Sequence, residues 1–558
     1  MTTLASLAAQ VAASGLSRDL FAVIAAFDFE SENDLQALLS IGDALRAVNQ
    51  LPLAARCYAR AGQLAPQAPE IPFIQAEVAQ LLGRTEDARA KFQALSDMQG
   101  VSPQLREIAR LKAACILPQV ITGQHEIVAA RTRIAAALTQ APPVTTPDIF
   151  LAGGFTNFYL AYQGEDDRVL QQALAQYYLR ICPSLAFAAP HVAAPAHGGR
   201  IRIGLLSRHF FNHTIAYLNQ GLITGLDRGR FELTLIRVPT GLAADDTARD
   251  LSAAAGAVCD LPLDLARARA MIAALNLDVL HYPDLGMDSF GYFLAFARLA
   301  KVQTVGWGHP VTTGIPNIDA FLSVDAMEPS GAEDHYSERL VRLAANVPAV
   351  PSPRVPSGPV DKIAFGIDPG RPAYLCPQSL FKVHPSFDQV TARLLARDPA
   401  AVIYFLGLWE PLNTTFLDRV RAHVGPNADR VRLVPRVMSD RFPDLLSCAD
   451  VILDIPEWSG GKTSLEALAA GIPIVHWPGR FMRGRHTLAF YTQMGLDDCV
   501  VNDMERYVDV AFRLVHDTAF RAQVRGDIRD RAPRLFNQLG AVREAEAYWA
   551  AACGRSAG

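Results

Sequence analysis

The sequence predicts an α/β protein in which a helical region precedes two separate parallel sheets. Three observations predict this class. Apolar residues recur at helical spacing up to about residue 190, short β-branched runs then alternate with helical stretches, and the same alternation restarts after a proline-rich interruption. Strands that alternate with helices in this way form parallel sheets with helices on both faces. With 558 residues, the chain is long enough for about three domains.

The helical region, residues 1–190, is predicted to be a tetratricopeptide-like domain. Ala, Leu, Gln and Arg are frequent in it, and few strand-like runs occur. Residues 51–66 match residues 85–100 at an offset of 34 positions, with Tyr58 opposite Phe92. That offset is the period of the tetratricopeptide repeat, and an ordinary helical bundle is the alternative. Either form offers a surface for another protein rather than chemistry.

Two α/β domains are predicted after this region. A segment rich in Pro, Ala and Gly at 188–199 marks the first boundary, and a linker with five prolines at 346–361 marks the second. We assign residues 199–346 to the first α/β domain, 362–535 to the second, and 536–558 to a C-terminal helix. Ligands of such sheets bind beyond the carboxyl ends of the strands, so we expect the site in a cleft between the two domains.

The composition is typical of a globular protein that binds neither nucleic acid nor membranes. Half of the residues are apolar, 19% are charged, and the formal net charge of −4 gives no general attraction to anionic partners. The N-terminus lacks the basic start of a signal peptide and no run of about 18 apolar residues occurs, so we expect a cytoplasmic location. Eight cysteines are scattered without metal-ligand spacing, and neither disulfides nor a metal site is expected.

The stretch PEWSGGKTSLEALAAG, residues 456–471, combines a glycine turn with a predicted helix. Its Gly461-Lys462-Thr463 is similar to the end of a P-loop, but Pro456 occupies the position of the first P-loop glycine and has no N–H group. A nucleoside triphosphate site is therefore disfavoured. The turn still offers unpaired N–H groups and the positive end of a helix dipole, both of which suit a diphosphate.

Two interpretations of this turn remain compatible. In the structural one, Thr463 is the N-cap and forms a capping box with Glu466. In the functional one, the N–H groups at residues 462–464, together with the hydroxyls of Thr463 and Ser464, hold a diphosphate while Glu466 accepts hydrogen bonds from a ribose. Lysine is rare in this chain, with six lysines against 46 arginines, and a compact ammonium suits phosphate. Lys382 and Lys462 are therefore of interest.

Five ordered motifs in the α/β part of the chain are shared with a known enzyme family. They are LSRHFFNHTIAYL (206–218), VQTVGWGHPVTTG (302–314), HYSERLVRL (335–343), CPQSLFKVHPSF (376–387) and DVILDIPEWSGGKTSLEALAAGIPIVHWPGRFMRGR (450–485). In this order they resemble glycosyltransferase family 41, and the chain looks like a bacterial relative of the O-linked N-acetylglucosamine transferases and SPINDLY proteins over about residues 150–535.

The resemblance implies a GT-B fold, in which two Rossmann-like domains face each other across a cleft, after an N-terminal helical region often built of tetratricopeptide repeats. It also implies inverting transfer of a sugar from a nucleotide diphosphate to a protein side chain. By analogy with GT-B enzymes, the last helix is expected to return to the first α/β domain.

The resemblance also implies roles for individual residues. His213 matches an active-site histidine that faces the acceptor and has been considered a base, and an imidazole pKa of about 6.5 suits that task. Lys382 matches a lysine that contacts the donor diphosphate, where a fixed cation offsets the charge of the leaving group. The structural alternatives are a hydrogen-bonded loop histidine and a solvated lysine. The residues expected to bind the nucleotide-sugar are Gln378, Lys382, Gly460, Gly461, Lys462, Thr463, Ser464 and Glu466.

Three residues of GWGHPVTTG, namely His309, Thr312 and Thr313, are expected to line the cleft near the sugar. This motif departs from the commoner Gly-Tyr-Pro-Gly-Thr-Ser-Gly form, which leaves the donor sugar open. Gly461 and Lys462 stand where the animal enzymes have His and Thr, so Lys462 is either a second cation of the site or a solvated side chain. For Arg483 and Arg485 we expect solvation, because arginine is so frequent in this chain.

We therefore expect an inverting, metal-independent glycosyltransferase that moves GlcNAc or glucose from a UDP-sugar to a protein, most readily to Ser or Thr. No Asp-x-Asp motif of the metal-using glycosyltransferases occurs, and no cofactor is expected. The acceptor protein would dock on the helical region. The alternatives are an asparagine glucosyltransferase of the HMW1C type, a nucleotide-sugar epimerase, and a non-catalytic tetratricopeptide interaction protein with a lapsed GT-B half.

Overall fold

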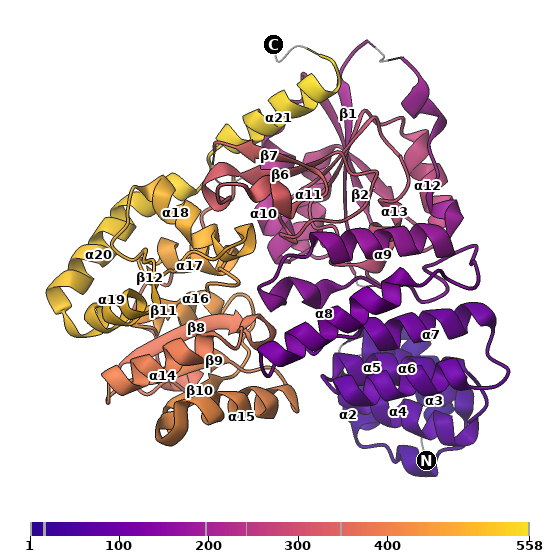
Figure 1. Ribbon diagram of the computed structural model, residues 1–558, viewed down its shortest axis with the longest axis horizontal. Helices are drawn as coiled ribbons and strands as arrows, with labels where there is room; N and C mark the ends of the chain where they lie inside the picture. The colour runs from indigo at the N-terminus through magenta and orange to yellow at the C-terminus, as the bar shows by residue number, and fades with distance from the viewer. Residues whose placement is uncertain are drawn as a thin grey trace. The chain divides into compact units, whose positions relative to one another are not determined.

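The computed structural model describes residues 3–14, 18–48, 50–195, 198–241, 243–345 and 349–555. Residues 196 and 197 of the first predicted linker and 346–348 of the second lie outside the described residues. The chain divides into two compact units, which Figure 1 shows as ribbons. The helical unit comprises Met1–Gln119, Ala129–Thr146 and Trp409–Leu412, and the sheet unit comprises Val120–Val128, Pro147–Leu408 and Asn413–Gly558.

The helical unit is built of helices that pack in chain order. Its helices are α1 (Leu4–Ser14), α2 (Arg18–Ala25), α3 (Leu35–Ala47), α4 (Leu51–Leu64), α5 (Glu70–Leu81), α6 (Thr85–Asp97), α7 (Pro103–Cys115) and most of α8 (Gln124–Thr139). Neighbouring helices from α3 to α7 pack on one another. Tyr58 of α4 and Phe92 of α6, which the 34-residue offset pairs, are both fully buried. The prediction of a helical, tetratricopeptide-like N-terminal region is confirmed.

The first sheet of the sheet unit is parallel throughout, in the order β3-β2-β1-β4-β5-β6-β7. Its strands are β1 (Ile201–Ser207), β2 (Phe231–Arg237), β3 (Ala257–Asp260), β4 (Val279–Tyr282), β5 (Val302–Val305), β6 (Ala320–Val324) and β7 (Arg339–Leu343). The central strands are buried along their whole length, which explains their nearly continuous apolar sequences.

The helices of this half are α9 (Arg168–Ile181), α10 (Thr214–Gly225), α11 (Asp246–Ala255), α12 (Leu265–Ala274) and α13 (Ser289–Leu294). Aspartate side chains start three of them: Asp245, Asp264 and Asp288 each accept a hydrogen bond from a first-turn N–H group of the helix that follows. These caps explain why α11, α12 and α13 begin at these residues.

The second sheet is also parallel, in the order β10-β9-β8-β11-β12. Its strands are β8 (Ala373–Ser379), β9 (Val402–Leu406), β10 (Val431–Val434), β11 (Val451–Leu453) and β12 (Ile474–Val475). The helices from this point on are α14 (Phe387–Arg397), α15 (Leu412–Val424), α16 (Phe442–Ser447), α17 (Lys462–Ala469), α18 (His486–Met494), α19 (Met504–His516), α20 (Thr518–Arg531) and α21 (Gly540–Ala552). Two parallel sheets with flanking helices are the α/β arrangement that the sequence predicts.

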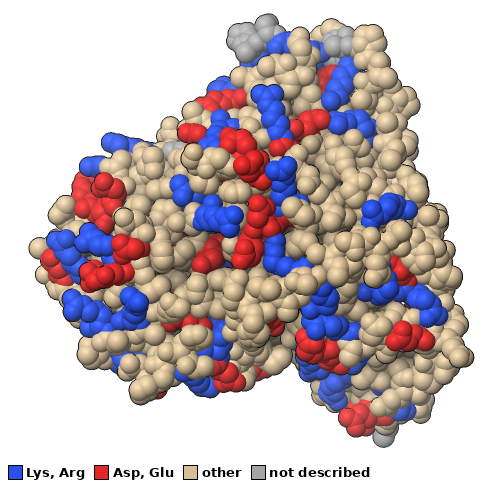
Figure 2. Space-filling model, in the orientation of Figure 1, with Lys and Arg blue, Asp and Glu red and all other residues tan. Residues whose placement is uncertain are grey.

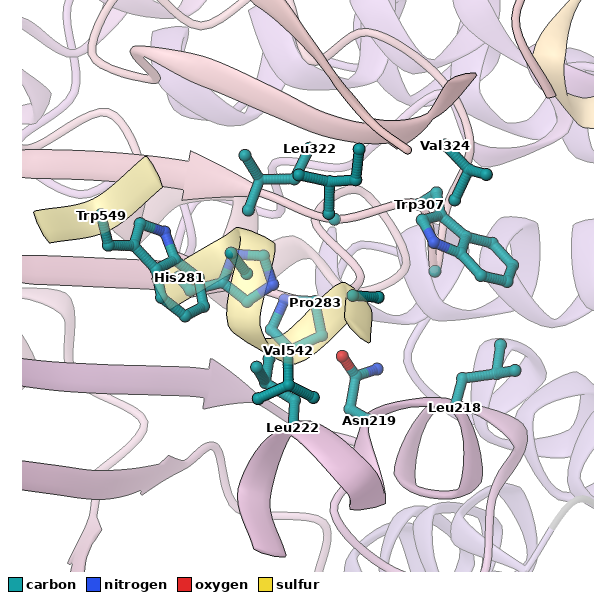
Figure 3. A pocket seen from close by; sticks show the side chains of 15 residues that line it. Leu218, Asn219, Leu222, His281, Pro283, Trp307, Leu322, Val324, Val542 and Trp549 are labelled. Carbon is teal, nitrogen blue, oxygen red and sulfur yellow. The ribbon is translucent and has the colours of Figure 1, made fainter. Parts of the chain in front are cut away.

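The last helix, α21, packs on the first sheet, as the analogy with GT-B enzymes predicts. Val542, Ala545 and Trp549 belong to the same buried cluster as the residues of β1 and β2. Figure 3 shows Trp549 beside His281 of β4, with their ring centroids 5.4 Å apart, at the wall of a cavity of about 50 Å³. The indole N–H of Trp549 donates to Thr304 Oγ1 at 3.2 Å. The chain thus returns from the second sheet to complete the core of the first.

The compact units are divided differently from the predicted domains: both α/β domains fall in one unit, and the helical unit ends earlier than predicted. Residues from Pro147 on, including α9, belong to the sheet unit, whereas the sequence places the end of the helical domain at 190. The physical reason is that helical spacing shows where helices form but does not show which core they cover. Tyr178 of α9, for example, packs edge-on against Phe293 of α13 at 5.0 Å.

Charged side chains are spread over the visible surface. On the face that Figure 2 shows, Lys and Arg lie interspersed with Asp and Glu rather than in one field of a single sign. No helix in the described part of the chain combines the length and the apolar character needed to cross a membrane.

Candidate active site

Lys382 lies beside the glycine turn that the sequence singles out. It ends a short 3-10 turn, Leu380–Lys382, directly after β8. Its Nζ is 3.4 Å from Oε1 of Gln378 and 5.4 Å from the ring centre of Trp458. A Cβ added to Gly460 would lie 3.0 Å from Nε2 of Gln378. Gln378 therefore connects the lysine to the turn, and the predicted cation and the predicted phosphate loop come together.

The ammonium group of Lys382 is available to a ligand. No ion pair of this lysine occurs among the described residues, and aromatic rings of Phe381 and Trp458 lie around it. Burial lowers the pKa of Lys382 to about 8, because removal from water disfavours the charged form. An anionic ligand would compensate this cost.

Asp454, at the end of β11, holds the glycine turn in place. Its Oδ1 accepts a hydrogen bond from the backbone N–H of Gly460 at 3.0 Å, and its Oδ2 accepts one from Ser459 Oγ at 2.6 Å. His476 Nδ1 lies 2.8 Å from the same Oδ2. Although burial raises it, the pKa of Asp454 is lowered overall by its bonds to His476 and Ser459. Sequence reasoning missed Asp454; a lone Asp directly after an apolar strand was the available signal.

The start of α17 differs from the predicted capping box. The helix begins at Lys462, its N-cap is Gly461, and no side chain caps its first turn. Thr463 already lies within the helix, while Glu466 lies 3.5 Å from Nζ of Lys462. The prediction of a Thr463–Glu466 capping box is wrong, because the two glycines shift the helix start by two residues. The first N–H groups of α17 are therefore left for an anion.

The hydroxyl of Ser464 is used within the protein. Ser464 is buried, and its Oγ is 2.9 Å from Oγ1 of Thr487 in α18. This contact turns the hydroxyl towards α18, so the predicted role of the Ser464 hydroxyl in binding a diphosphate is not supported. Glu466 is buried as well, and burial raises its pKa despite the opposing charge of Lys462.

The loops that follow the strands of the two sheets meet at this turn. Nζ of Lys462 lies 5.3 Å from the ring centre of Tyr217 in α10. The ring of Trp307, after β5, lies 5.2 Å from the ring of His486 in α18. A Cβ on Gly461 would come within 4.0 Å of Trp307. We call the first sheet with its helices the first lobe and the second sheet with its helices the second lobe. Both lobes contribute residues where the sequence predicts the ligand site. Lys462, in the second lobe, contacts Tyr217 of the first lobe.

His213 is the N-cap of α10, next to this junction. Its Nδ1 accepts a hydrogen bond from the N–H group of Ile215 at 3.2 Å. A ring nitrogen that accepts carries no proton, so the neutral imidazole has its proton on Nε2. Burial, the neighbouring His209 and the charges of Lys462 and Lys382 lower the pKa of His213 to about 4. His213 is thus a neutral hydrogen-bond donor at physiological pH.

A second histidine and a carboxylate lie beside His213. His209 Nδ1 is 2.5 Å from Oδ2 of Asp284, which follows β4, and Ser207 Oγ donates to the same oxygen at 2.9 Å. The ring of His209 stacks on that of His213, with centroids 4.6 Å apart and planes at 27°. Sequence reasoning missed His209 and Asp284, which lie 75 positions apart in the chain.

The predicted sugar-side residues His309, Thr312 and Thr313 are all buried. Thr312 Oγ1 donates to Oε2 of Glu338 at 2.6 Å, and Thr313 donates its N–H group to Oε1 at 2.7 Å and its hydroxyl to the same oxygen. Both hydroxyls therefore satisfy a buried carboxylate, as burial of a charge requires. His309 stacks on Phe158 at 5.1 Å, and burial lowers its pKa to about 4. A contact between these residues and a sugar stays a prediction.

Arg483 is buried, and the expectation that it is solvated is wrong. Its Nη2 donates to the carbonyl oxygen of Glu165 at 2.6 Å and lies 3.3 Å from Oδ2 of Asp167. The segment before α9 supplies these partners, which sequence reasoning assigned to another domain. Arg485 is half-buried and donates to the carbonyl oxygen of Gly479 at 3.2 Å.

The part of the chain that the structure describes contains no cluster of three or more His, Cys, Asp and Glu side chains arranged to hold a metal ion. The groups that could hold a negatively charged ligand are instead Lys382, Lys462 and the N–H groups that begin α17. Two parallel sheets with flanking helices and such groups at their junction fit the GT-B architecture.

Comparison with known proteins agrees with this class. Residues 371–543 match the model of Glycosyl transferase family 41. A mutant of the Thermobaculum terrenum O-GlcNAc transferase superimposes with a TM-score of 0.72 at 24% identity, covering 97% of this chain and 99% of that one. The chain is therefore similar in sequence to proteins of family 41 over residues 371–543 and similar in fold to an O-GlcNAc transferase.

The curated relatives are much longer than the matched region. The probable UDP-N-acetylglucosamine–peptide N-acetylglucosaminyltransferase SPINDLY of Arabidopsis thaliana is 24% identical over 343 residues, which is 59% of this chain and 36% of that protein. The SPINDLY protein of Petunia hybrida is 25% identical over 337 residues, again 59% of this chain and 36% of the relative. The match thus spans about a third of these relatives.

Proposed function

We propose that the protein is an inverting, metal-independent glycosyltransferase that moves a sugar from a UDP-sugar to a protein side chain, foremost the hydroxyl of Ser or Thr. The observation that carries this proposal is that Lys382 lies beside the start of α17, which no side chain caps. Gln378 lies between them: it contacts Lys382 and adjoins Gly460 of the turn before the helix. The names of the family 41 relatives support a UDP-GlcNAc donor, and the departures in GWGHPVTTG keep UDP-glucose as the alternative.

The proposed reaction is one direct displacement. The acceptor oxygen attacks the anomeric carbon from the face opposite the diphosphate, and the bond between that carbon and the diphosphate oxygen breaks. Negative charge then grows on the departing UDP. Lys382 and the N–H groups at the start of α17 stabilise this negative charge, and the stabilisation is greater in the transition state than in the bound substrate. Lys462, held 3.5 Å from Glu466, supplies a second, partly compensated cation.

Mass spectrometry of peptides tests donor and linkage together. The full chain would be incubated with UDP-GlcNAc, UDP-glucose and GDP-fucose and with peptides that contain Ser/Thr or Asn-x-Ser/Thr. A hexosamine or hexose mass on a Ser/Thr peptide supports the proposal. Glucose on asparagine supports the asparagine-modifying alternative instead. Absence of both transfer and UDP binding would favour the non-catalytic interaction protein.

Deleting the helical unit would test whether this unit docks the acceptor protein.

Removal of divalent cations is expected to leave transfer unchanged. The proposal assigns the stabilisation of the leaving group to Lys382 and α17 rather than to a metal ion. Transfer rates in EDTA and in added Mg²⁺ are expected to agree within about twofold, since no charge of the proposed site would be lost. Loss of activity in EDTA with recovery in Mg²⁺ would contradict the metal-independent mechanism.

Gly460→Ala is expected to weaken UDP binding at least about tenfold, or about 1.4 kcal/mol. The added Cβ would lie 2.4 Å from Ser464 Oγ and 3.0 Å from Gln378 Nε2, so the turn must shift away from Lys382. Calorimetric titration with UDP measures the effect. Gly526→Ala in α20 is the matched control, because nothing lies within 4 Å of its added Cβ. Equal affinities for the two variants would contradict the assignment of the turn.

A further inference from the structure

We propose that His209, oriented by Asp284, is the general base that removes the proton of the acceptor hydroxyl, and that His213 acts beside it as a hydrogen-bond donor. This inference rests on the proposed glycosyl transfer and adds to it the residue that activates the nucleophile.

The geometry of the His209–Asp284 pair leaves one ring nitrogen of His209 free. A carboxylate only accepts hydrogen bonds, so the ring nitrogen 2.5 Å from Asp284 Oδ2 is the donor, Nδ1–H. The neutral ring then has its lone pair on Nε2. No hydrogen-bond partner of Nε2 occurs among the described residues, and the side chain keeps 15% of its surface exposed. A lone pair with solvent access is what a base needs.

Asp284 is itself held rigidly. It is buried, and its Oδ2 also accepts the hydroxyl hydrogen of Ser207, whose Oγ accepts the backbone N–H of His209 at 2.9 Å. The carboxylate thus selects the tautomer and the orientation of the ring from the ends of β1 and β4. An imidazolium formed at His209 would be stabilised by the same carboxylate.

His213 has the opposite arrangement. Its Nδ1 is occupied by the N–H group of Ile215, and its Nε2 carries the proton. Accepting a proton would require the loss of the helix cap that begins α10. Its Nε2–H can instead donate to the acceptor oxygen or to the donor sugar. The two stacked rings therefore present one acceptor and one donor nitrogen.

We assign this pair to the acceptor side of the reacting bond. His213 lies close enough to Lys462 and Lys382 for their charges to act on it, so the stacked histidines adjoin the proposed diphosphate site. In the proposed step the acceptor O–H gives its proton to Nε2 of His209. The oxygen forms the bond to the anomeric carbon, and the electron pair of the broken bond leaves on UDP.

The charges that face His209 define the pH range of the base. Burial and the charge of Arg208 lower the pKa of His209. The hydrogen bond and charge of Asp284, together with the charge of Asp288, raise it. The net result is a pKa above the ordinary value for histidine. His213 faces His209 from the loop before α10. Because only the neutral ring accepts a proton, kcat/KM is expected to fall as the pH is lowered through this pKa.

His209→Asn and His213→Asn form the matched pair for the test, with the donor and peptide that the mass-spectrometric assay selects. In His209→Asn, the amide still donates to Asp284 but has no basic nitrogen. Its kcat is expected to fall roughly 10²–10⁴-fold, with the UDP Kd unchanged. In His213→Asn, the side chain still caps α10 and a loss of less than about tenfold is expected. His209→Gln serves as a second removal of the base if His209→Asn folds poorly.

Two further readouts distinguish a base from a structural residue. Added imidazole is expected to restore transfer by His209→Gly but not by His213→Gly. Asp284→Asn is expected to reverse the tautomer of His209 and to lower kcat with little change in KM. If the wild type transfers sugar and His209→Asn keeps more than a third of its kcat across pH 6 to 9, the assignment of the base fails alone. If the wild type neither binds UDP nor transfers sugar, the proposed function fails.

Discussion

Lys382→Ala is expected to lower the kcat of sugar transfer roughly 10²–10³-fold, or about 3–4 kcal/mol in the activation barrier. The ammonium group has no ion-pair partner among the described residues and lies 3.4 Å from the glutamine that contacts the glycine turn. A fixed cation that is not neutralised by the protein acts fully on the charge of the leaving UDP. The effect on the UDP Kd is expected to be smaller, since the ground state carries less charge at the breaking bond.

Lys462→Ala is the matched control for this prediction. Lys462 also lies at the junction of the lobes, but Glu466 at 3.5 Å already offsets its charge. We expect a loss of about tenfold or less, because a paired and partly exposed cation is worth less. Steady-state rates of UDP release and calorimetry with UDP separate the effects on kcat and on Kd. Equal losses in the two variants would contradict the central role of Lys382.

The fold could be predicted because its signals are local. Alternation of β-branched runs with helical stretches is visible in windows of a few residues, and it predicts both parallel sheets. The proximity of Lys382 to the Gly460 turn depends in addition on the order of the strands: β8 and β11 are neighbouring parallel strands, and both residues follow carboxyl ends. The resemblance to family 41 supplied the roles that the pattern alone does not contain.

The parts that could not be predicted depend on contacts between distant segments. His209 pairs with Asp284, and Thr312 with Glu338, across 75 and 26 positions of the chain. No spacing rule connects such residues until the order of the strands is known. The prediction of a capping box at Thr463 was wrong for a local reason: a glycine pair allows the N-cap, Gly461, to lie two residues before Thr463, the residue with the best capping side chain.

The stability of the lysine-bearing loop depends on a buried ion pair behind it. Arg419 of α15 donates two hydrogen bonds to Asp388 of α14, at 2.8 and 2.9 Å, and both side chains are 1% exposed. The same guanidinium donates to the carbonyl oxygens of Ile121 and Val383, at 2.7 and 3.0 Å. Val383 directly follows Lys382, so this pair supports the turn that positions Lys382.

Asp388→Ala is therefore expected to destabilise the sheet unit by about 3–5 kcal/mol, since it leaves the Arg419 charge buried and unpaired. The midpoint of thermal unfolding should fall by roughly 5 °C, because the unfolding entropy of a unit this large is high. The matched control is Asp418→Ala, which removes an exposed pair of α15, the helix that carries Arg419: Asp418 and Arg421 lie 3.1 Å apart with 64% and 57% of their side chains exposed. Its expected cost is below about 1 kcal/mol. Because Val383 loses its support only in the first variant, UDP binding at a temperature where both are folded should weaken in Asp388→Ala alone. Equal midpoints for the two variants would show that the buried pair does not hold this loop.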